Sequence, residues 1–278
     1  MTHTPASSSQ LVLPGTLVLA GAGKMGGAML RGWLDAGAAA AQIAVVDPQP
    51  APDMVALAAE QGFSIHPDAS ELNDVAIVVL AVKPQILDAA ATTLSSLMDS
   101  KPLVVSIAAG KSVADITQAL GDTPVVRSMP NTPASVGRGI TAAFAGSHVS
   151  NEQRDLATAL LKAVGDVVWL DDEDLMDAVT AVSGSGPAYV FWLAECMAAA
   201  GRELGLPDDL ADALARATVS GAGELMHQAA EPASALRENV TSPGGTTAAA
   251  LAVLMADDGL KPLMAKALTA ARDRAREL

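Results

Sequence analysis

Short runs of consecutive apolar, mostly β-branched residues recur along the first 170 residues, and amphipathic segments separate them. Several runs are apolar throughout, as expected of strands that helices cover on both faces. This alternation predicts βαβ units that form a mainly parallel sheet. The predicted strands are Leu17–Ala20, Ile43–Val46, Ala76–Val82, Leu103–Ile107, Val125–Arg127, Gly139–Ala145 and Asp166–Leu170. The predicted helices among them are Met25–Asp35, Met54–Gln61, Ile86–Met98, Val113–Leu120 and Glu152–Val164.

Beyond Asp172 the β-rich runs disappear, and alanine-rich amphipathic stretches separated by Gly and Pro take over. Pro207 and Pro262 fall where helices would begin, and proline is favoured in the first turn of a helix. The apolar faces of these helices are too extensive for so small a domain to bury, which predicts a homodimer. The predicted helices are Glu173–Val182, Pro187–Leu204, Asp208–Ala229, Ala233–Asn239, Thr246–Asp257 and Lys261–Arg276.

The two patterns predict two domains. Residues 1–15 are expected to be a disordered tail, residues 16–172 an α/β domain with a doubly wound sheet, and residues 173–278 an all-helical dimerisation domain. The composition agrees, because half of the residues are apolar and only 3% are aromatic. Such a composition suits helices packed closely on a sheet better than an all-β sandwich.

The charge and hydropathy of the chain exclude several classes of partner. A formal net charge of −14 opposes binding to nucleic acid or to an anionic membrane. No apolar run reaches the roughly 18 residues that a membrane-spanning helix needs, and Met1–Gln10 lacks the basic start and apolar stretch of a secretory signal. We therefore expect a cytoplasmic protein without a nucleic-acid or membrane partner.

Cysteine and histidine offer no metal chemistry. The single cysteine, Cys196, lies within Tyr189–Ala200, which has the pattern of a buried helix, so we predict a packed thiol rather than a nucleophile. One cysteine also excludes an internal disulfide and a CxxC metal site. The histidines are single and far apart, without HxxxH or HExxH spacing, so no metal site is expected.

A glycine-rich turn follows the first predicted strand and opens the first predicted helix. Its sequence, Gly21-Ala22-Gly23-Lys24-Met25-Gly26, has the GxGxxG spacing of a dinucleotide-binding turn. The glycines permit a tight turn and close approach of a pyrophosphate, and the helix N-terminus offers unpaired N–H groups and a positive dipole. The motif is specific here because of its strand-turn-helix context, although a purely structural glycine turn is the alternative. The α/β domain is thus expected to be of the Rossmann type and to bind a nicotinamide cofactor.

Asp47 ends the next predicted strand, where an acidic residue about 20 residues beyond the motif would bind the adenosine ribose. A carboxylate accepts hydrogen bonds from both ribose hydroxyls but repels a 2′-phosphate, and Asp47–Asp53 contains no Lys or Arg to offset that repulsion. The sequence therefore favours NADH over NADPH. The alternative is that Asp47 is a solvated turn residue before Pro48, and Lys24 is either a phosphate contact or a solvated lysine.

Two further turns are expected to line the cofactor cleft, because ligands of open α/β sheets lie beyond the carboxyl ends of the strands. Their small residues leave room for the ribose and nicotinamide. The predicted cofactor-binding residues in these turns are Ala81, Val82, Lys83 and Pro84 in the first, and Ile107, Ala108 and Ala109 in the second.

Five short motifs, in this order along the chain, make the sequence similar to pyrroline-5-carboxylate reductases. They are Ala81–Pro84, Ala108–Gly110, Met129–Pro133, Ser183–Tyr189 and Asn239–Thr247. The resemblance implies reduction of 1-pyrroline-5-carboxylate to L-proline with NADPH or NADH, the last step of proline biosynthesis. It also implies a Rossmann domain, an all-helical domain that interlocks two subunits, and larger rings of dimers in some members. Asp47 and Pro48 depart from the hydroxyl or basic residues common in the family, which bears on the choice of cofactor.

The resemblance also assigns site residues. It places Thr247 beside the imine nitrogen as the catalytic residue, and the backbone N–H groups from Gly245 to Thr247 around the substrate carboxylate. The substrate site that it implies comprises Glu173, Ser185, Gly186, Gly244, Gly245, Thr246 and Thr247, and it adds Asn131 and Asn239 to the cofactor site. The residue types agree, because Ser242–Thr247 is a glycine turn that opens a predicted helix and can bind an anion; an ordinary N-cap is the alternative.

An iminium carbon is strongly electrophilic, so hydride transfer needs positioning more than a strong protein acid. Near-attack geometry alone can be worth roughly 7–11 kcal/mol. The closest alternative is a β-hydroxyacid dehydrogenase, which needs a lysine on the first helices of its second domain, and no lysine occurs between Lys162 and Lys261. A non-catalytic NAD(P)-binding sensor is the alternative from another class.

Overall fold

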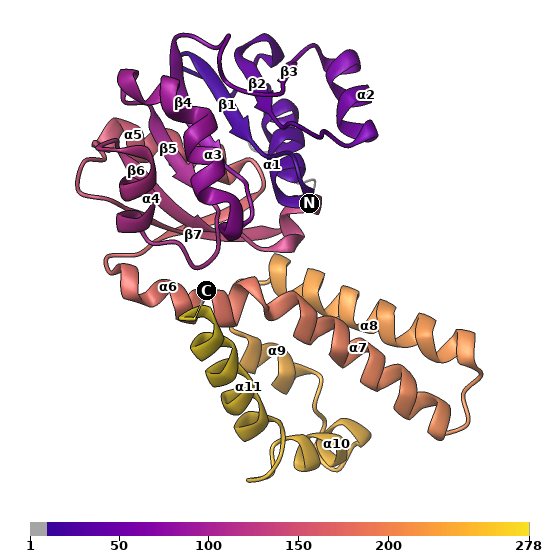
Figure 1. Ribbon diagram of the computed structural model, residues 1–278. Helices are drawn as coiled ribbons and strands as arrows, with labels where there is room; N and C mark the ends of the chain where they lie inside the picture. Colours follow the sequence, from indigo (N-terminus) through magenta and orange to yellow (C-terminus); the bar gives the residue numbers. More distant parts are fainter. Residues whose placement is uncertain (1–9, 278) are drawn as a thin grey trace. The chain divides into compact units, whose positions relative to one another are not determined.

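The computed structural model describes residues 10–277, and Figure 1 traces them along the sequence. The chain divides into two compact units. The first unit comprises the chain up to Gly184 together with the segment that begins at Arg272. The second unit is Ser185–Ala271. Each unit has its own architecture.

An eight-stranded sheet in the order β3-β2-β1-β4-β5-β6-β7-β8 forms the centre of the first unit. All neighbouring strands are parallel except β6 and β7, which are antiparallel. The order reverses direction between β1 and β4, which defines a doubly wound sheet. The strands are β1 (Thr16–Ala20), β2 (Ile43–Val46), β3 (Ser64–His66), β4 (Val75–Leu80), β5 (Leu103–Ser106), β6 (Val125–Met129), β7 (Gly139–Ala145) and β8 (Gly165–Trp169).

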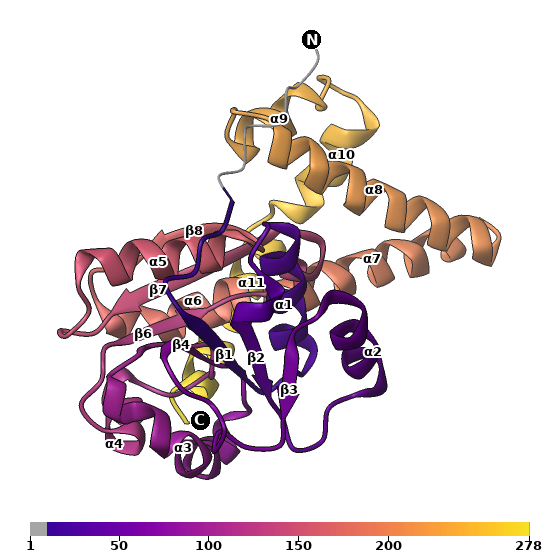
Figure 2. The same cartoon turned by 90° about the horizontal axis from the view of Figure 1, so that it is seen from above.

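Helices cover both faces of this sheet, which Figure 2 shows from above. Alternate residues of each inner strand enter different apolar clusters: Leu17 and Leu19 face α1, α2 and α5, whereas Val18 faces α3 and α4. Burial on both faces explains why these strands are apolar throughout. The helices are α1 (Lys24–Asp35), α2 (Pro52–Gln61), α3 (Leu87–Leu94), α4 (Val113–Leu120), α5 (Asn151–Lys162) and the short α6 (Met176–Val179).

The predicted α/β fold class is confirmed, and most predicted elements agree with the structure to within one or two residues. The strand β3 was not predicted, because three residues are too few to show a pattern. The predicted disordered tail is wrong for residues 10–15: Leu11 and Leu13 are buried in the core, where the Leu11 N–H donates to the Ala36 carbonyl at 2.9 Å. The rest of the predicted tail, residues 1–9, lies outside the described residues.

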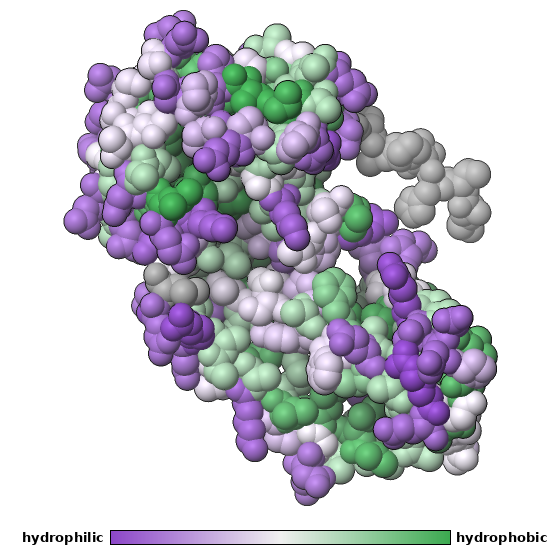
Figure 3. Space-filling view, turned by 45° about the vertical axis from the view of Figure 1, so that its right-hand side comes forward, coloured by the Kyte–Doolittle hydropathy of each residue, from purple (hydrophilic) through white to green (hydrophobic). Residues whose placement is uncertain are grey.

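The second unit is helical. It contains α7 (Gly186–Glu203), α8 (Asp208–Gln228), α9 (Ala233–Asn239), α10 (Thr246–Leu254) and most of α11 (Leu260–Ala275). Helix α7 packs mainly on α8. Within Ser185–Ala271 the only buried apolar side chains are alanines, Ala198, Ala211 and Ala215. Most of the large apolar residues of this unit are exposed, and Figure 3 shows apolar patches on its surface.

Cys196 belongs to this exposed surface, so the prediction of a packed thiol is wrong for the single chain. Phe191 and Trp192, on the same helix, are 63% and 64% exposed. The apolar pattern of α7 was recognised correctly, but a pattern does not reveal whether its own chain covers it. No helix among residues 10–277 is long and apolar enough to cross a membrane.

Candidate functional site

The carboxyl ends of five neighbouring strands, from β3 to β5 in the order of the sheet, lie level with one another in the first unit. The residue that follows β2, β1, β4 or β5 donates its N–H to the last carbonyl of the neighbouring strand. These bonds are Asp47 to His66 at 3.0 Å, Gly21 to Val46 at 2.9 Å, Ala81 to Ala20 at 2.8 Å and Ile107 to Leu80 at 3.0 Å. The turns that contain the predicted cofactor-binding residues thus leave the sheet at a common edge, next to the point where the strand order reverses.

The glycines at both ends of the Gly21–Gly26 turn are required by packing within the protein. Gly21 has φ +87°, and a Cβ there would lie 2.9 Å from the Ala81 carbonyl oxygen. A Cβ on Gly26 would lie 2.4 Å from the Gly21 carbonyl oxygen and 3.0 Å from the Ala81 Cβ. Because both positions lack a side chain, helix α1 and the end of β4 can pack tightly against the turn.

Gly23, between them, has a different reason to be glycine. A Cβ built on Gly23 would meet no protein atom within 4 Å, and its φ of −66° is open to any residue. The space beside Gly23 is therefore free on the side that faces solvent. That is the position at which a pyrophosphate would approach the backbone, so the residues present fit a dinucleotide.

The N-terminus of α1 carries no side-chain cap and no acidic residue in its first turn. Helices α4 and α5 of the same unit, by contrast, each begin with a capping box, formed by Ser112 with Asp115 and by Ser150 with Gln153. The first N–H groups of α1 are thus available to an anionic ligand, and the helix dipole favours one. Lys24 is exposed here, whereas Met25 packs partly against the core.

Asp47 is bound to the glycine turn. Its Oδ2 accepts a hydrogen bond from the Ala22 N–H at 3.0 Å, and its Oδ1 accepts one from the Gln49 N–H at 2.9 Å. The carboxylate therefore links the turn after β1 to the loop after β2. The side chain is partly buried, so it is more than a solvated turn residue.

A cavity of about 930 Å³ opens beside the glycine turn, entirely within the first unit. Ala22, Gly23, Lys24 and Met25 form one wall, and residues 132–137, which follow β6, contribute to another. The cavity reaches the charged side chains of Arg31 and Asp53, which lie 3.4 Å apart. This volume is sufficient for part of a dinucleotide.

The turns after β4 and β5 complete this edge. Ala81 and Val82 contact the glycine turn, and Lys83 is exposed before the short 3₁₀ helix η2 (Pro84–Ile86). In the next turn Ala108 is buried, whereas Ile107 and Ala109 are partly exposed. The Ala108 N–H donates to the Ser106 hydroxyl oxygen at 3.2 Å, and the Ser128 hydroxyl donates to the Ser106 carbonyl at 2.9 Å. Neither serine was predicted as a site residue.

Glu173 was predicted to lie near the substrate, and its carboxylate is bound by protein groups. Its Oε1 accepts hydrogen bonds from the Val113 N–H at 2.8 Å and from Arg127 Nη1 at 2.9 Å. The Arg127 side chain is only 10% exposed and that of Glu173 24%. Glu173 therefore links β6, through Arg127, and the first turn of α4, through Val113, to the segment that leads into the helical unit. Hydrogen bonds from Ser112 also hold the pKa of the nearby Asp115 below its usual value.

Asn131 also makes two internal contacts. Its Oδ1 accepts a hydrogen bond from the Ile140 N–H at 3.0 Å, and its Nδ2 donates to the Ser183 hydroxyl oxygen at 3.3 Å. Ser183 belongs to a π-helical turn, Thr180–Gly184, which follows α6. Such π-helical turns are rare in proteins, and a large share of them occur at functional sites.

The remaining predicted substrate residues, and Asn239 of the predicted cofactor site, lie in the second unit. Ser185 precedes α7, which begins at Gly186, and Asn239 ends α9. The turn Ser242–Gly245 leads into α10 at Thr246, as predicted; Gly244 has φ +72°, and Gly245 is the N-cap without a side-chain partner. Thr247, in the first turn of α10, is partly buried and Thr246 is exposed. The Gly245 N–H donates to the Ser242 carbonyl at 3.0 Å, so the N–H groups open to an anion are those of Thr246 and Thr247 in the first turn of α10.

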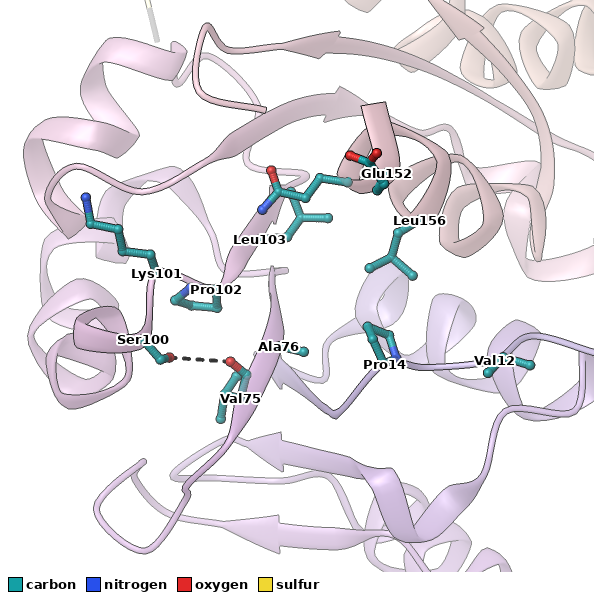
Figure 4. A pocket seen from close by; sticks show the side chains of 11 residues that line it. Val12, Pro14, Val75, Ala76, Ser100, Lys101, Pro102, Leu103, Glu152 and Leu156 are labelled. Carbon is teal, nitrogen blue, oxygen red and sulfur yellow. Dashed lines mark hydrogen bonds between the residues drawn. The ribbon is translucent and has the colours of Figure 1, made fainter. Parts of the chain in front are cut away.

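Another cavity, of about 480 Å³, lies at the opposite edge of the sheet, where β4 and β5 begin. Figure 4 shows its lining, which includes Pro14, Lys101 and Glu152, with the Ser100 hydroxyl donating to the Val75 carbonyl at 3.4 Å. None of the predicted site residues lines it.

The doubly wound sheet, the glycine turn and the uncapped α1 define a dinucleotide-binding protein of the Rossmann type. Residues 16–110 match the family of NADP oxidoreductases dependent on coenzyme F420, and residues 173–278 match the pyrroline-5-carboxylate reductase dimerisation family. The chain is 43% identical over 261 residues to the pyrroline-5-carboxylate reductase of Pseudomonas aeruginosa, covering 93% of this chain and 94% of the relative. It belongs to the pyrroline-5-carboxylate reductase family.

Solved structures agree with this assignment. The pyrroline-5-carboxylate reductase of Coxiella burnetii superposes with a TM-score of 0.88 and 36% identity, covering 95% of this chain and 98% of that one. The Plasmodium falciparum pyrroline carboxylate reductase, solved with NADP bound, has a TM-score of 0.80 and 26% identity over 97% of this chain and 99% of that one. The family resemblance predicted from the motifs is confirmed.

Proposed function

We propose that this protein reduces 1-pyrroline-5-carboxylate to L-proline by hydride transfer from a reduced nicotinamide cofactor. The observation that carries the proposal is the Gly21–Gly26 turn, whose middle glycine borders free space while its outer glycines are packed. Membership of the reductase family specifies the substrate.

A bound dihydronicotinamide would supply a hydride to the imine carbon, and the electron pair of the C=N bond would pass to the already protonated ring nitrogen, which would become a secondary amine. The protein therefore has to bind and orient its ligands rather than supply a strong acid. The N–H groups of Thr246 and Thr247 would bind the substrate carboxylate, and the Thr247 hydroxyl would hydrogen-bond the ring nitrogen. The Gly245 N–H, predicted to join them, is instead bound to the Ser242 carbonyl.

The choice of cofactor follows from Asp47. Two backbone N–H groups hold its carboxylate in place. There it would accept hydrogen bonds from the ribose hydroxyls of NADH. A 2′-phosphate at the same place would meet like charge, and no Lys or Arg occurs between Asp47 and Asp53. The protein thus prefers NADH, although NADPH is the alternative cofactor.

The same proposal includes a homodimer through the helical unit. Large exposed apolar side chains such as Val253, at 72% exposed, require a partner, and residues 173–278 match a dimerisation family. A larger ring of dimers and a cytoplasmic location stay predictions from the sequence.

The test is an assay of NADH and NADPH oxidation with 1-pyrroline-5-carboxylate, in which formation of L-proline is measured in the same reaction. We expect turnover with both cofactors and a higher kcat/KM with NADH. Cofactor binding without turnover would instead support a non-catalytic sensor and contradict the proposed activity.

A further inference from the structure

Two buried serines lie beneath the turn that follows β5. Ser106 is the last residue of β5 and is fully buried, and Ser128, on the neighbouring strand β6, is 2% exposed. Both stand among strand residues that are otherwise almost all apolar. Burying a hydroxyl lowers the stability of the fold unless the hydroxyl makes a hydrogen bond. The hydrogen-bond partners of these two serines therefore indicate their role.

Both serines act on the backbone of this turn. Ser106 Oγ accepts the Ala108 N–H at 3.2 Å, and Ser128 Oγ donates to the Ser106 carbonyl at 2.9 Å. The turn is also fixed where it begins, by the Ile107 N–H on the Leu80 carbonyl, and where α4 begins, by the Val113 N–H on Glu173. Only five residues, Ala108–Ser112, lie between these points, and Gly110 among them has φ +72°.

The position of this turn assigns it to one half of the cofactor. The glycine turn and Asp47 follow β1 and β2, on one side of the point where the strand order reverses, and so accept the adenosine half of a dinucleotide. The turn after β5 is on the other side of that point, where the nicotinamide half lies when the dinucleotide crosses the sheet.

We propose that Ser106, supported by Ser128, is a positioning residue for the nicotinamide half of the cofactor, acting through the backbone of Ile107–Gly110. This inference rests on the proposed function for the identity of the cofactor. Without the Ser106 hydroxyl, the Ala108 N–H is buried and unpaired, and the turn shifts until that group finds another partner.

The test compares Ser106→Ala and Ser128→Ala with Thr123→Val. Thr123 is the matched control, because it is 3% exposed and its hydroxyl donates to the Pro102 carbonyl at 2.8 Å at the opposite edge of the same strands. Dissociation constants are measured by calorimetry for NADH and for ADP-ribose, which lacks the nicotinamide. Melting temperatures of the variants measure the structural cost alone.

We expect Ser106→Ala to weaken NADH binding about three- to tenfold, the effect of one lost hydrogen bond, and to leave ADP-ribose binding unchanged. Ser128→Ala should have a smaller effect of the same kind, and Thr123→Val should change neither constant. Equal weakening of both ligands, or unchanged NADH binding, overturns the inference. These binding measurements do not depend on turnover. If the protein showed no reductase activity while Ser106→Ala still weakened the binding of NADH alone, the proposed reaction would be refuted and the role of Ser106 would stand.

Discussion

The carboxylate of Asp47 accepts a hydrogen bond from the backbone N–H of Ala22 at 3.0 Å, 25 residues earlier in the chain. One side chain thus both braces the glycine turn and carries the negative charge next to the expected ribose. The two roles can be separated by substitution, because a neutral polar residue removes the negative charge but can still accept a hydrogen bond from the turn.

Replacing Asp47 by Ser is expected to shift the ratio of kcat/KM for NADPH over NADH upward by about tenfold, since roughly 1.4 kcal/mol of repulsion is removed. Steady-state rates with both cofactors measure the ratio. Asp53→Ser is the control, because Asp53 is an exposed acid that lines the cavity beside the glycine turn and is paired with Arg31. A ratio that moves equally in both variants would mean that general charge, and not Asp47, governs the choice.

Replacing Gly23 by Ala is expected to raise the dissociation constant for NADH about tenfold or more, because the added methyl group occupies the free space beside the turn. The stability should fall by less than about 1 kcal/mol, since no protein atom lies within 4 Å of that methyl. Thermal unfolding and calorimetric binding measure the two effects.

The contrasting variant is Gly26→Ala. Its Cβ would lie 2.4 Å from the Gly21 carbonyl oxygen, so we expect a lower melting temperature, with a cost of about 1–3 kcal/mol. If Gly23→Ala also lost stability to that extent, or if it bound NADH normally, the turn would not be the pyrophosphate site.

Replacing Thr247 by Val is expected to lower kcat/KM for 1-pyrroline-5-carboxylate about tenfold or more, in line with a lost hydrogen bond to a charged group at about 1.5–3 kcal/mol. Thr247→Ser keeps the hydroxyl and should retain most of the activity. The dissociation constant for NADH should be unchanged in both variants. Equal kinetics for Val and Ser would exclude the hydroxyl from the reaction.

Breaking the ion pair between Arg127 and Glu173 should destabilise the first unit. Removing Glu173 leaves a guanidinium that is 10% exposed without its counter-charge, and such a loss costs about 3–5 kcal/mol. Chemical denaturation of Glu173→Ala, Arg127→Met and the double variant measures the coupling between the two residues. Asp122→Ala, which removes the exposed contacts with Lys101 and His148, is the control and should cost less than about 1 kcal/mol. A value for Glu173→Ala near that of the control would show that the pair does not brace the unit.

Local pattern was sufficient for most of the fold. The strands of the sheet and the helices that cover it begin and end close to the predicted residues, since each carries its own apolar periodicity and its own Gly or Pro boundary. The glycine turn was recognisable for the same reason, because its strand, turn and helix are contiguous in sequence. The strand Ser64–His66 and the buried Leu11 lacked such a signal.

The unpredicted parts of the site depend on pairs of residues that are distant in sequence. Arg127 and Glu173 are 46 residues apart, and Ser128 and Ser106 are 22 apart, so neither pair leaves a local pattern. A serine at the end of a strand resembles an ordinary turn residue until its partner is known. The exposure of Cys196 had a different cause, because periodicity identifies an apolar helix face without identifying the chain that covers it.

The segment that begins at Arg272 belongs to the same unit as the sheet, although the whole helical unit separates the two in sequence. Ala275 is buried there, and Arg276 lies 3.5 Å from Asp177. During synthesis the ribosome therefore releases all of Ser185–Ala271 before the nucleotide-binding half receives its last helical turn. A nascent or truncated chain that stops short of Arg272 would lack the buried Ala275 and the ion pair between Arg276 and Asp177.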